Sequence, residues 1–218
     1  MELLFDGGIY MEIKKNIFKE NSKMNYNRQA EIYDEKGDGK FVAPMYGEII
    51  HRIMRAKPKK LLDVGCGTGN VLIKLSSNED LNLYGLDISE NMIETAKKNL
   101  GNKAELKVGD SEYMPWEDNS FDVIVCNASF HHYPNPEKVL SEMKRMLKSE
   151  GTLIIGDPTA PVIIRQLINL NCKSSKKGDY RLYSKTEIED ILIKCGFVPF
   201  EFKMINCKSF AINAKIKE

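Results

Sequence analysis

The chain has 218 residues, of which 42% are apolar and 29% are charged, and its formal net charge is +1. This length and composition are typical of one globular domain that buries a full core. The near balance of acids and bases excludes a long-range field that would hold nucleic acid or an anionic membrane, although it leaves room for a local patch.

Five cysteines are widely spaced along the chain and include no C-x-x-C pair. We therefore expect no disulfide framework, no metal site, and reduced thiols in a cytoplasmic protein. The first residues carry no basic segment followed by an apolar one, so no signal peptide is expected. No apolar run approaches the roughly 18 residues that cross a bilayer, so no membrane span is expected.

Residues 1–40 precede the first predicted strand, and we interpret them as an N-terminal extension or lid on a domain of residues 41–218. An early helix is predicted around Ile49–Met54, whose apolar residues recur on one face. His51 lies on this helix and is expected to be exposed.

From Lys60 onward, short apolar runs alternate with helical patterns, which predicts βαβ units and a mostly parallel sheet. The continuous apolarity of the runs predicts strands that helices cover on both faces. The predicted strands are residues 61–64, 81–86, 104–108, 123–126 and 152–155.

Capping residues mark the starts of three helices. Ser89 can cap the first. Pro136 directly follows Asn135 at the start of the second, whose buried stripe is expected to include Leu147. Ser184 and Glu187 match the capping box of the third.

The chain ends in two runs of alternating apolar and polar residues, 200–204 and 210–216, with a turn near residues 206–209. This period-2 pattern predicts a β-hairpin, so the sheet should finish with an antiparallel strand. A further apolar helix is expected near Val162–Leu170. Together these patterns predict a doubly wound α/β fold.

A glycine-rich turn, Gly65-Cys66-Gly67-Thr68-Gly69, joins the first strand to a helix at residues 71–75. Glycine lets the backbone approach a ligand closely, and N–H groups at a helix start favour an anionic or electron-rich group. A dinucleotide fingerprint would place another glycine where this chain has Asn70, which disfavours a nicotinamide cofactor. Cys66 is interpreted as a small residue in a tight turn rather than a reactive thiol.

Two acidic residues follow the next strands. Asp87 lies 20 residues beyond Gly67, where a carboxylate can accept hydrogen bonds from ribose hydroxyls. Its alternative role is that of a favourable acid at the start of the Ser89 helix. Asp110, in Gly109-Asp110-Ser111, can accept from an adenine amino group, or can belong to a plain turn.

Three segments, LLDVGCGTGN, GLDIS and VGDSEYMPWEDNSFDVIVCNASFHHYPNPEKVLSEMKRMLKSEGTLIIGDP, closely resemble class I S-adenosylmethionine (SAM)-dependent methyltransferases. Among these, the chain looks most like the broad group that includes the ubiquinone and menaquinone biosynthesis enzymes. The resemblance covers about Leu61 to Pro158. It implies a seven-stranded sheet with the last strand antiparallel, and SAM as cofactor.

The resemblance also implies a set of cofactor contacts. The methionine moiety would meet Asp63 and the glycine turn, the adenine would pack on Ile88 and Met92, and the sulfonium end would meet Asn127. An upstream tyrosine, Tyr26 or Tyr33, matches a lid residue, although either can equally be a packing residue. The full candidate set is Tyr33, Asp63, Gly65, Cys66, Gly67, Thr68, Gly69, Asp87, Ile88, Met92, Gly109, Asp110, Ser111 and Asn127.

Methyl transfer chiefly requires orientation of the two reactants, with a general base only where the nucleophile arrives protonated. His131 and His132 are the candidate bases, and a structural role is the alternative for both. The segment Asn127–Phe130 is not the [DN]-P-P-[YF] motif of enzymes that methylate exocyclic amines. No nucleic-acid platform is present, so a small-molecule acceptor is expected, with residues 159–183 contributing to its pocket.

Two other functions stay open at this point. The chain can be a non-catalytic SAM-binding or regulatory protein, because fold and cofactor site do not prove turnover. A nicotinamide-dependent oxidoreductase is the second alternative.

Overall fold

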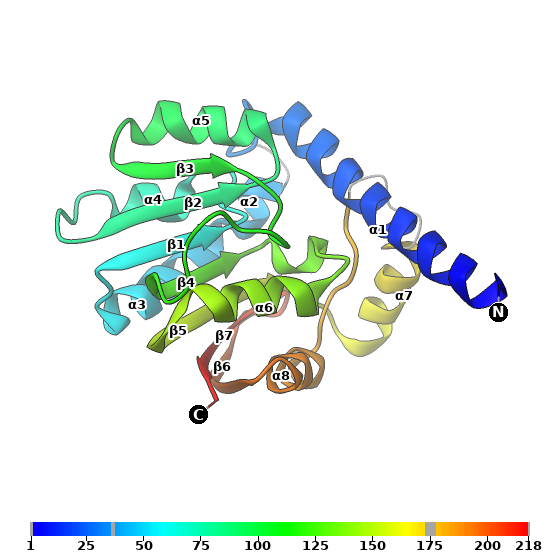
Figure 1. Cartoon of the computed structure of the whole chain (residues 1–218). Helices are drawn as coiled ribbons and strands as arrows, with labels where there is room; N and C mark the ends of the chain where they lie inside the picture. The colour runs from blue at the N-terminus through cyan, green and yellow to red at the C-terminus, as the bar shows by residue number, and fades with distance from the viewer. Residues whose placement is uncertain (1, 36–37, 173–177, 218) are drawn as a thin grey trace.

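The computed structural model describes residues 2–35, 38–172 and 178–217, and it contains a seven-stranded sheet in the order β3-β2-β1-β4-β5-β7-β6 (Figure 1). Strands β1 to β5 are parallel, and β7 runs antiparallel to β5 and β6. The predicted sheet and its terminal hairpin are confirmed. The strands are β1 (Lys60–Val64), β2 (Asn82–Asp87), β3 (Ala104–Val108), β4 (Phe121–Asn127), β5 (Leu147–Pro158), β6 (Phe197–Asn206) and β7 (Ser209–Ile216).

The helix starts follow the predicted caps. The Ser89 hydroxyl accepts from the Met92 N–H, and Ser184 forms its capping box with Glu187. Asn135 precedes a helix at Pro136, but its side chain makes no cap hydrogen bond. The helices are α1 (Glu2–Gln29), α2 (Asp38–Val42), η1 (Ala43–Met45), α3 (Tyr46–Ala56), α4 (Asn70–Leu75), α5 (Glu90–Leu100), η2 (Phe130–His132), α6 (Pro136–Met146), α7 (Val162–Cys172) and α8 (Lys185–Lys194).

Two apolar cores lie on opposite faces of the sheet. Helices α3, α4 and α5 contribute to one core, and α6 and α8 contribute to the other. Successive strand residues point to opposite faces, so Leu61 joins the first core and Leu62 the second, and both are fully buried. The predicted two-sided covering therefore holds for the central strands. His51 on α3 is exposed, as expected.

Two details of the sequence prediction are wrong. Only Leu106 of β3 is buried, because β3 is an edge strand with a neighbour on one side. Leu147 is buried, but it begins β5 instead of extending α6.

Helix α1 crosses the end of the sheet at which the parallel strands finish (Figure 1). Ion pairs join Lys19 to Asp110 and Lys23 to Glu90. Asn27 accepts a hydrogen bond from the Ser89 hydroxyl. The segment interpreted as an extension is thus held against the loops that follow β2 and β3. Across the described ranges, every helix is either too short or too polar to cross a bilayer.

Candidate cofactor and acceptor site

A cavity of about 950 Å³, counting the space at its mouth, lies at the carboxyl ends of the parallel strands, beneath α1. Strands β1 and β4 are adjacent here although β2 and β3 lie between them in the chain, so this is the switch point of the sheet. Open α/β sheets bind ligands at such points.

The glycine turn enters the cavity through Gly67. A Cβ on Gly67 would meet nothing within 4 Å, and its φ is +53°, so the backbone here is open toward the cavity. Gly65 and Gly69 are required by close packing. A Cβ on Gly65 would lie 2.0 Å from the Ser129 hydroxyl oxygen, and a Cβ on Gly69 would lie 2.9 Å from a Leu100 methyl carbon. Gly69 does not line the cavity, whereas the other thirteen predicted cofactor residues do.

Asp87 has the helix-start role that the sequence allowed, and its contact with a ribose stays a prediction. One of its carboxylate oxygens accepts from the Gly67 N–H at 2.9 Å, and the other accepts from the Ser89 N–H at 2.9 Å. The carboxylate therefore organises the glycine turn and the start of α5 while it lines the cavity. Burial raises the pKa of Asp87, and the backbone donors act against this rise.

Asp63 and Asn127 line the cavity, and each has one side-chain oxygen without a hydrogen-bond partner in the described part of the chain. The Oδ1 atoms of both side chains are buried and have no hydrogen-bond partner among the described residues. Burial, and secondly the nearby Asp87 charge, raise the pKa of Asp63 to about 8. Because an unpaired buried acceptor is costly, these oxygens suit a ligand that donates hydrogen bonds, such as an ammonium group.

Asp110 lines the cavity but already has partners. One oxygen pairs with the Lys19 ammonium at 2.8 Å, and the other accepts from the Glu112 N–H at 2.9 Å. Lys19 also pairs with the buried Glu112 carboxylate at 2.6 Å. The adenine contact predicted for Asp110 stays a prediction, and α1 holds the carboxylate that would make it.

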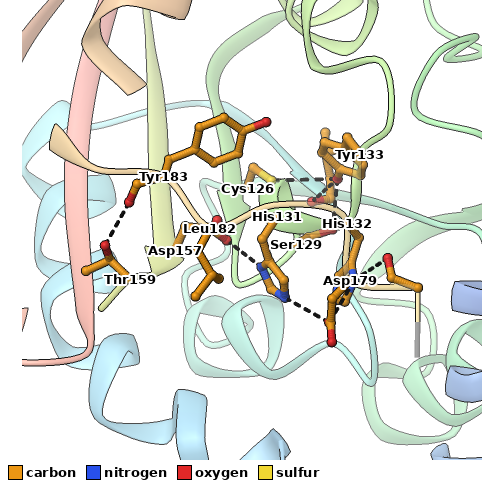
Figure 2. A network of polar contacts seen from close by, with 12 residues as sticks. Cys126, Ser129, His131, His132, Tyr133, Asp157, Thr159, Asp179, Leu182 and Tyr183 are labelled. Atoms are coloured by element: carbon orange, nitrogen blue, oxygen red, sulfur yellow. Dashed lines mark hydrogen bonds and ion pairs between the residues drawn. The ribbon is translucent and has the colours of Figure 1, made fainter. Parts of the chain in front are cut away.

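The two histidines share Asp179 as a neighbour, at 3.9 Å from His131 and 3.5 Å from His132, and differ in their other partners (Figure 2). His131 Nδ1 lies 2.9 Å from the buried Asp157 carboxylate, and its Nε2 lies 3.9 Å from Asp179. His132 Nδ1 donates to the Gly178 carbonyl at 3.1 Å, because a carbonyl can only accept. His132 Nε2 therefore accepts from the Tyr26 hydroxyl at 2.8 Å. His132 lines the cavity, whereas His131 lies outside its lining.

The surroundings of the two histidines shift their pKa values in opposite directions. Burial lowers the pKa of His131, but the Asp157 carboxylate outweighs it, so the pKa lies above its ordinary value. Burial and the neighbouring His131 hold the pKa of His132 well below its ordinary value. The residue at the cavity is thus neutral, with its Nε2 lone pair directed at a tyrosine hydroxyl.

His131, His132 and Asp179 also bring one potential metal-ligand atom each within 4.8 Å of one another. Both ring nitrogens of His132 already have hydrogen-bond partners on Gly178 and Tyr26. A metal would displace at least one of these bonds. The contacts therefore favour a hydrogen-bonded network at this cluster.

Several cavity residues were missed from the sequence. Lys19 and Ser22 come from α1, which carried no helix prediction. Tyr46 comes from α3. Tyr133, whose hydroxyl bonds to Ser129 at 2.8 Å, directly follows the histidine pair, and this proximity was the one signal that could have found it.

The fold and the cavity at its switch point define an open α/β domain with a candidate ligand site, and similar proteins indicate the class of ligand. A family model described as a methyltransferase domain matches residues 62–155. The demethylmenaquinone methyltransferase of Bacillus mycoides (strain KBAB4) is 38% identical over 120 residues, covering 52% of this chain and 51% of that protein. The 27-O-demethylrifamycin SV methyltransferase of Amycolatopsis mediterranei (strain S699) is 33% identical over 103 residues, covering 45% of this chain and 38% of that protein.

This chain thus spans about half the length, or less, of these two relatives. A solved SAM-dependent methyltransferase from Aquifex aeolicus is similar over a larger share. It superposes with a TM-score of 0.64 at 25% identity, covering 81% of this chain and 95% of that chain. Residues 62–155 thus match a methyltransferase domain, and the chain is similar in fold to a solved SAM-dependent methyltransferase.

Proposed function

We propose that this chain binds SAM in the cavity beneath α1 and transfers its methyl group to a small-molecule acceptor. The observation that carries the proposal is the unpaired oxygen of Asp63, a residue that lines the same cavity as the open Gly67 backbone and the Asp87 carboxylate. When bound, SAM supplies an electrophilic methyl group on a sulfonium ion, whose positive charge is neutralised as the methyl moves.

Each part of the cavity has a chemical counterpart in the cofactor. Asp63 would hold the amino group of the methionine tail, because its orphaned oxygen requires a donor. Asp87 would accept from the ribose hydroxyls with the lone pairs that Gly67 and Ser89 leave. Ile88 and Met92 offer apolar surface for the adenine ring.

The acceptor side would be formed by α1 and by residues 159–183, of which residues 173–177 lie outside the described part of the chain. Tyr180 donates its backbone N–H to the His131 carbonyl at 2.9 Å, so this segment reaches the histidine pair. The two relatives are named for methylation of demethylmenaquinone and of a demethylrifamycin. These names support a small organic acceptor here. We propose that α1 acts as the lid and that residues 41–218 form the methyltransferase domain.

A change at Asp87 tests the cofactor assignment. Asp87→Ala should weaken S-adenosylhomocysteine binding by at least about tenfold in calorimetry, since hydrogen bonds to a charged group contribute roughly 1.5–3 kcal/mol. Glu94→Ala, on the exposed side of α5, which follows Asp87, is the control and should bind like the unmodified chain. Equal affinity in the two variants would refute the ribose assignment.

A measurement of methyl transfer distinguishes an enzyme from a protein that only binds SAM. Incubation of the chain with labelled SAM and cell extract should yield one labelled product, which also identifies the acceptor. Binding of SAM with no labelled product from any acceptor pool would favour the regulatory alternative. Thermal protection by NAD, and none by SAM, would favour the oxidoreductase alternative.

We propose His132 as the general base where the acceptor is protonated, because it lines the cavity and is held neutral, and the acceptor would replace the Tyr26 hydroxyl at Nε2. His132→Ala should lower kcat by about 10²–10⁴-fold with unchanged S-adenosylhomocysteine affinity. His51→Ala, on an exposed helix face, is the control. His132→Gln still accepts a hydrogen bond but takes up no proton, so full activity in that variant would make His132 a positioning residue.

A further inference from the structure

Helix α7 is fastened to the body of the protein through its polar side. Arg165, Asn169 and Cys172 follow the spacing i, i+4, i+7, and they are the less exposed residues of the helix. The Asn169 side chain both accepts from and donates to the Leu182 backbone, at 2.8 and 3.0 Å. The Arg165 guanidinium donates to the Ala160 carbonyl at 2.9 Å.

The apolar side of α7 faces solvent. Ile163, Leu167 and Leu170 repeat the same spacing on the opposite face, and 74%, 57% and 62% of their surfaces are exposed. An amphipathic helix that covers a core has the reverse orientation. Single exposed apolar residues are ordinary, but a contiguous row marks an interaction surface.

Helix α1 adds a second exposed row at the same end of the molecule (Figure 1). Tyr10, Ile13 and Ile17 lie on one face of α1 and are more than half exposed. We call these three residues, with Ile163, Leu167 and Leu170, the α1–α7 surface.

Positive charge adjoins this surface. A groove between the two helices is lined by Phe18, Leu170 and Tyr180 together with Lys14, Lys15 and Arg181. Arg181 pairs with Glu187, but neither lysine forms an ion pair with an acidic side chain in the described ranges. Apolar rows bordered by cations are typical of segments that lie in the interface of an anionic bilayer.

We propose that the α1–α7 surface docks on an anionic phospholipid membrane. Its aliphatic side chains would enter the boundary between headgroups and acyl chains, and Lys14 and Lys15 would meet the lipid phosphates. α7 has 11 residues, so it would lie along the interface and not span it. The proposal does not depend on methyl transfer.

Sedimentation with lipid vesicles tests this proposal on the full chain. The unmodified chain should bind vesicles of phosphatidylcholine and phosphatidylglycerol at least tenfold more tightly than vesicles of phosphatidylcholine alone, and salt should weaken the binding. The double variant Ile163→Asp/Leu167→Asp should lose this binding. Ile193→Asp is the matched control, because Ile193 is equally exposed on α8 but lies outside the surface.

S-adenosylhomocysteine affinity and circular dichroism should be unchanged in the double variant, which shows that it is folded. Equal vesicle binding by the double variant and the Ile193→Asp control would overturn the proposal. Absence of binding by the unmodified chain would also overturn it. A dimer in light scattering that dissociates in the double variant would assign the surface to a second copy instead.

Discussion

The chemistry of this site depends on a buried carboxyl group that lacks a partner. Asp63 is 1% exposed, and burial raises its pKa to about 8. Its folded-state pKa therefore exceeds the unfolded value of about 3.9, so its contribution to stability is present below that value and is lost as pH rises toward 8. At neutral pH the carboxyl group is mainly protonated until a cation enters the cavity.

Binding of a cationic amine should lower the pKa of Asp63 and release a proton at pH 7. We expect the calorimetric binding enthalpy of S-adenosylhomocysteine to vary with the ionisation enthalpy of the buffer, which reports that proton. Asp63→Asn, which has no proton to release, should abolish the dependence. The same buffer dependence in Asp63→Asn and in the unmodified chain would show that a group other than Asp63 releases the proton.

Helix α1 lines the cavity and is held there by a few polar contacts. Lys19 pairs with both Asp110 and the buried Glu112, whereas Lys23 pairs with the exposed Glu90. Loss of one ion-pair partner from a buried carboxylate is costly, even though Asn135 and Lys138 would still contact Glu112, whereas an exposed ion pair contributes little. Lys19 should therefore matter more than Lys23 for the position of the helix.

Lys19→Ala should accelerate release of S-adenosylhomocysteine and tryptic cleavage within α1. Lys23→Ala removes a lysine from the same helix and should have almost no effect on either rate. Stopped-flow displacement and limited proteolysis measure the two quantities. Equal release rates in the two variants would show that the Lys19 pairs do not hold α1 closed.

At the scale of the whole molecule, one buried cation ties an early helix to the terminal hairpin. Arg52 of α3 is 4% exposed and donates to Glu48, to the Glu201 carbonyl and to Asn213. Arg55, one turn later, pairs with Glu201 at the surface. The two arginines thus offer a comparison of a buried and an exposed contact between the same elements.

Arg52→Ala should lower the free energy of unfolding by about 3–5 kcal/mol, because it leaves buried partners unpaired. Arg55→Ala should lower it by about 1 kcal/mol or less. Denaturant unfolding of both variants measures the difference. Similar losses would mean that the buried contacts do not stabilise the hairpin against α3.

Local signals explain what the sequence predicted well. The glycine turn, the Ser89 cap and the Ser184–Glu187 capping box each depend on residues a few positions apart, so they can be recognised from the sequence alone. Asp87 was recognisable because βαβ units place successive strand ends at one edge of the sheet. The exposure of β3 was mispredicted, because its edge position is a property of the whole sheet.

By itself, the sequence determined the strand–helix alternation and the terminal hairpin. Of the fourteen candidate cofactor residues that it indicated, thirteen line the cavity. Only the tertiary structure decided which histidine faces the cavity, since Asp157 lies 26 residues from His131 and Tyr26 lies 106 residues from His132. It also decided that α1 covers the site and that α7 exposes its apolar side. These features depend on contacts between distant segments, whose pairing no local pattern encodes.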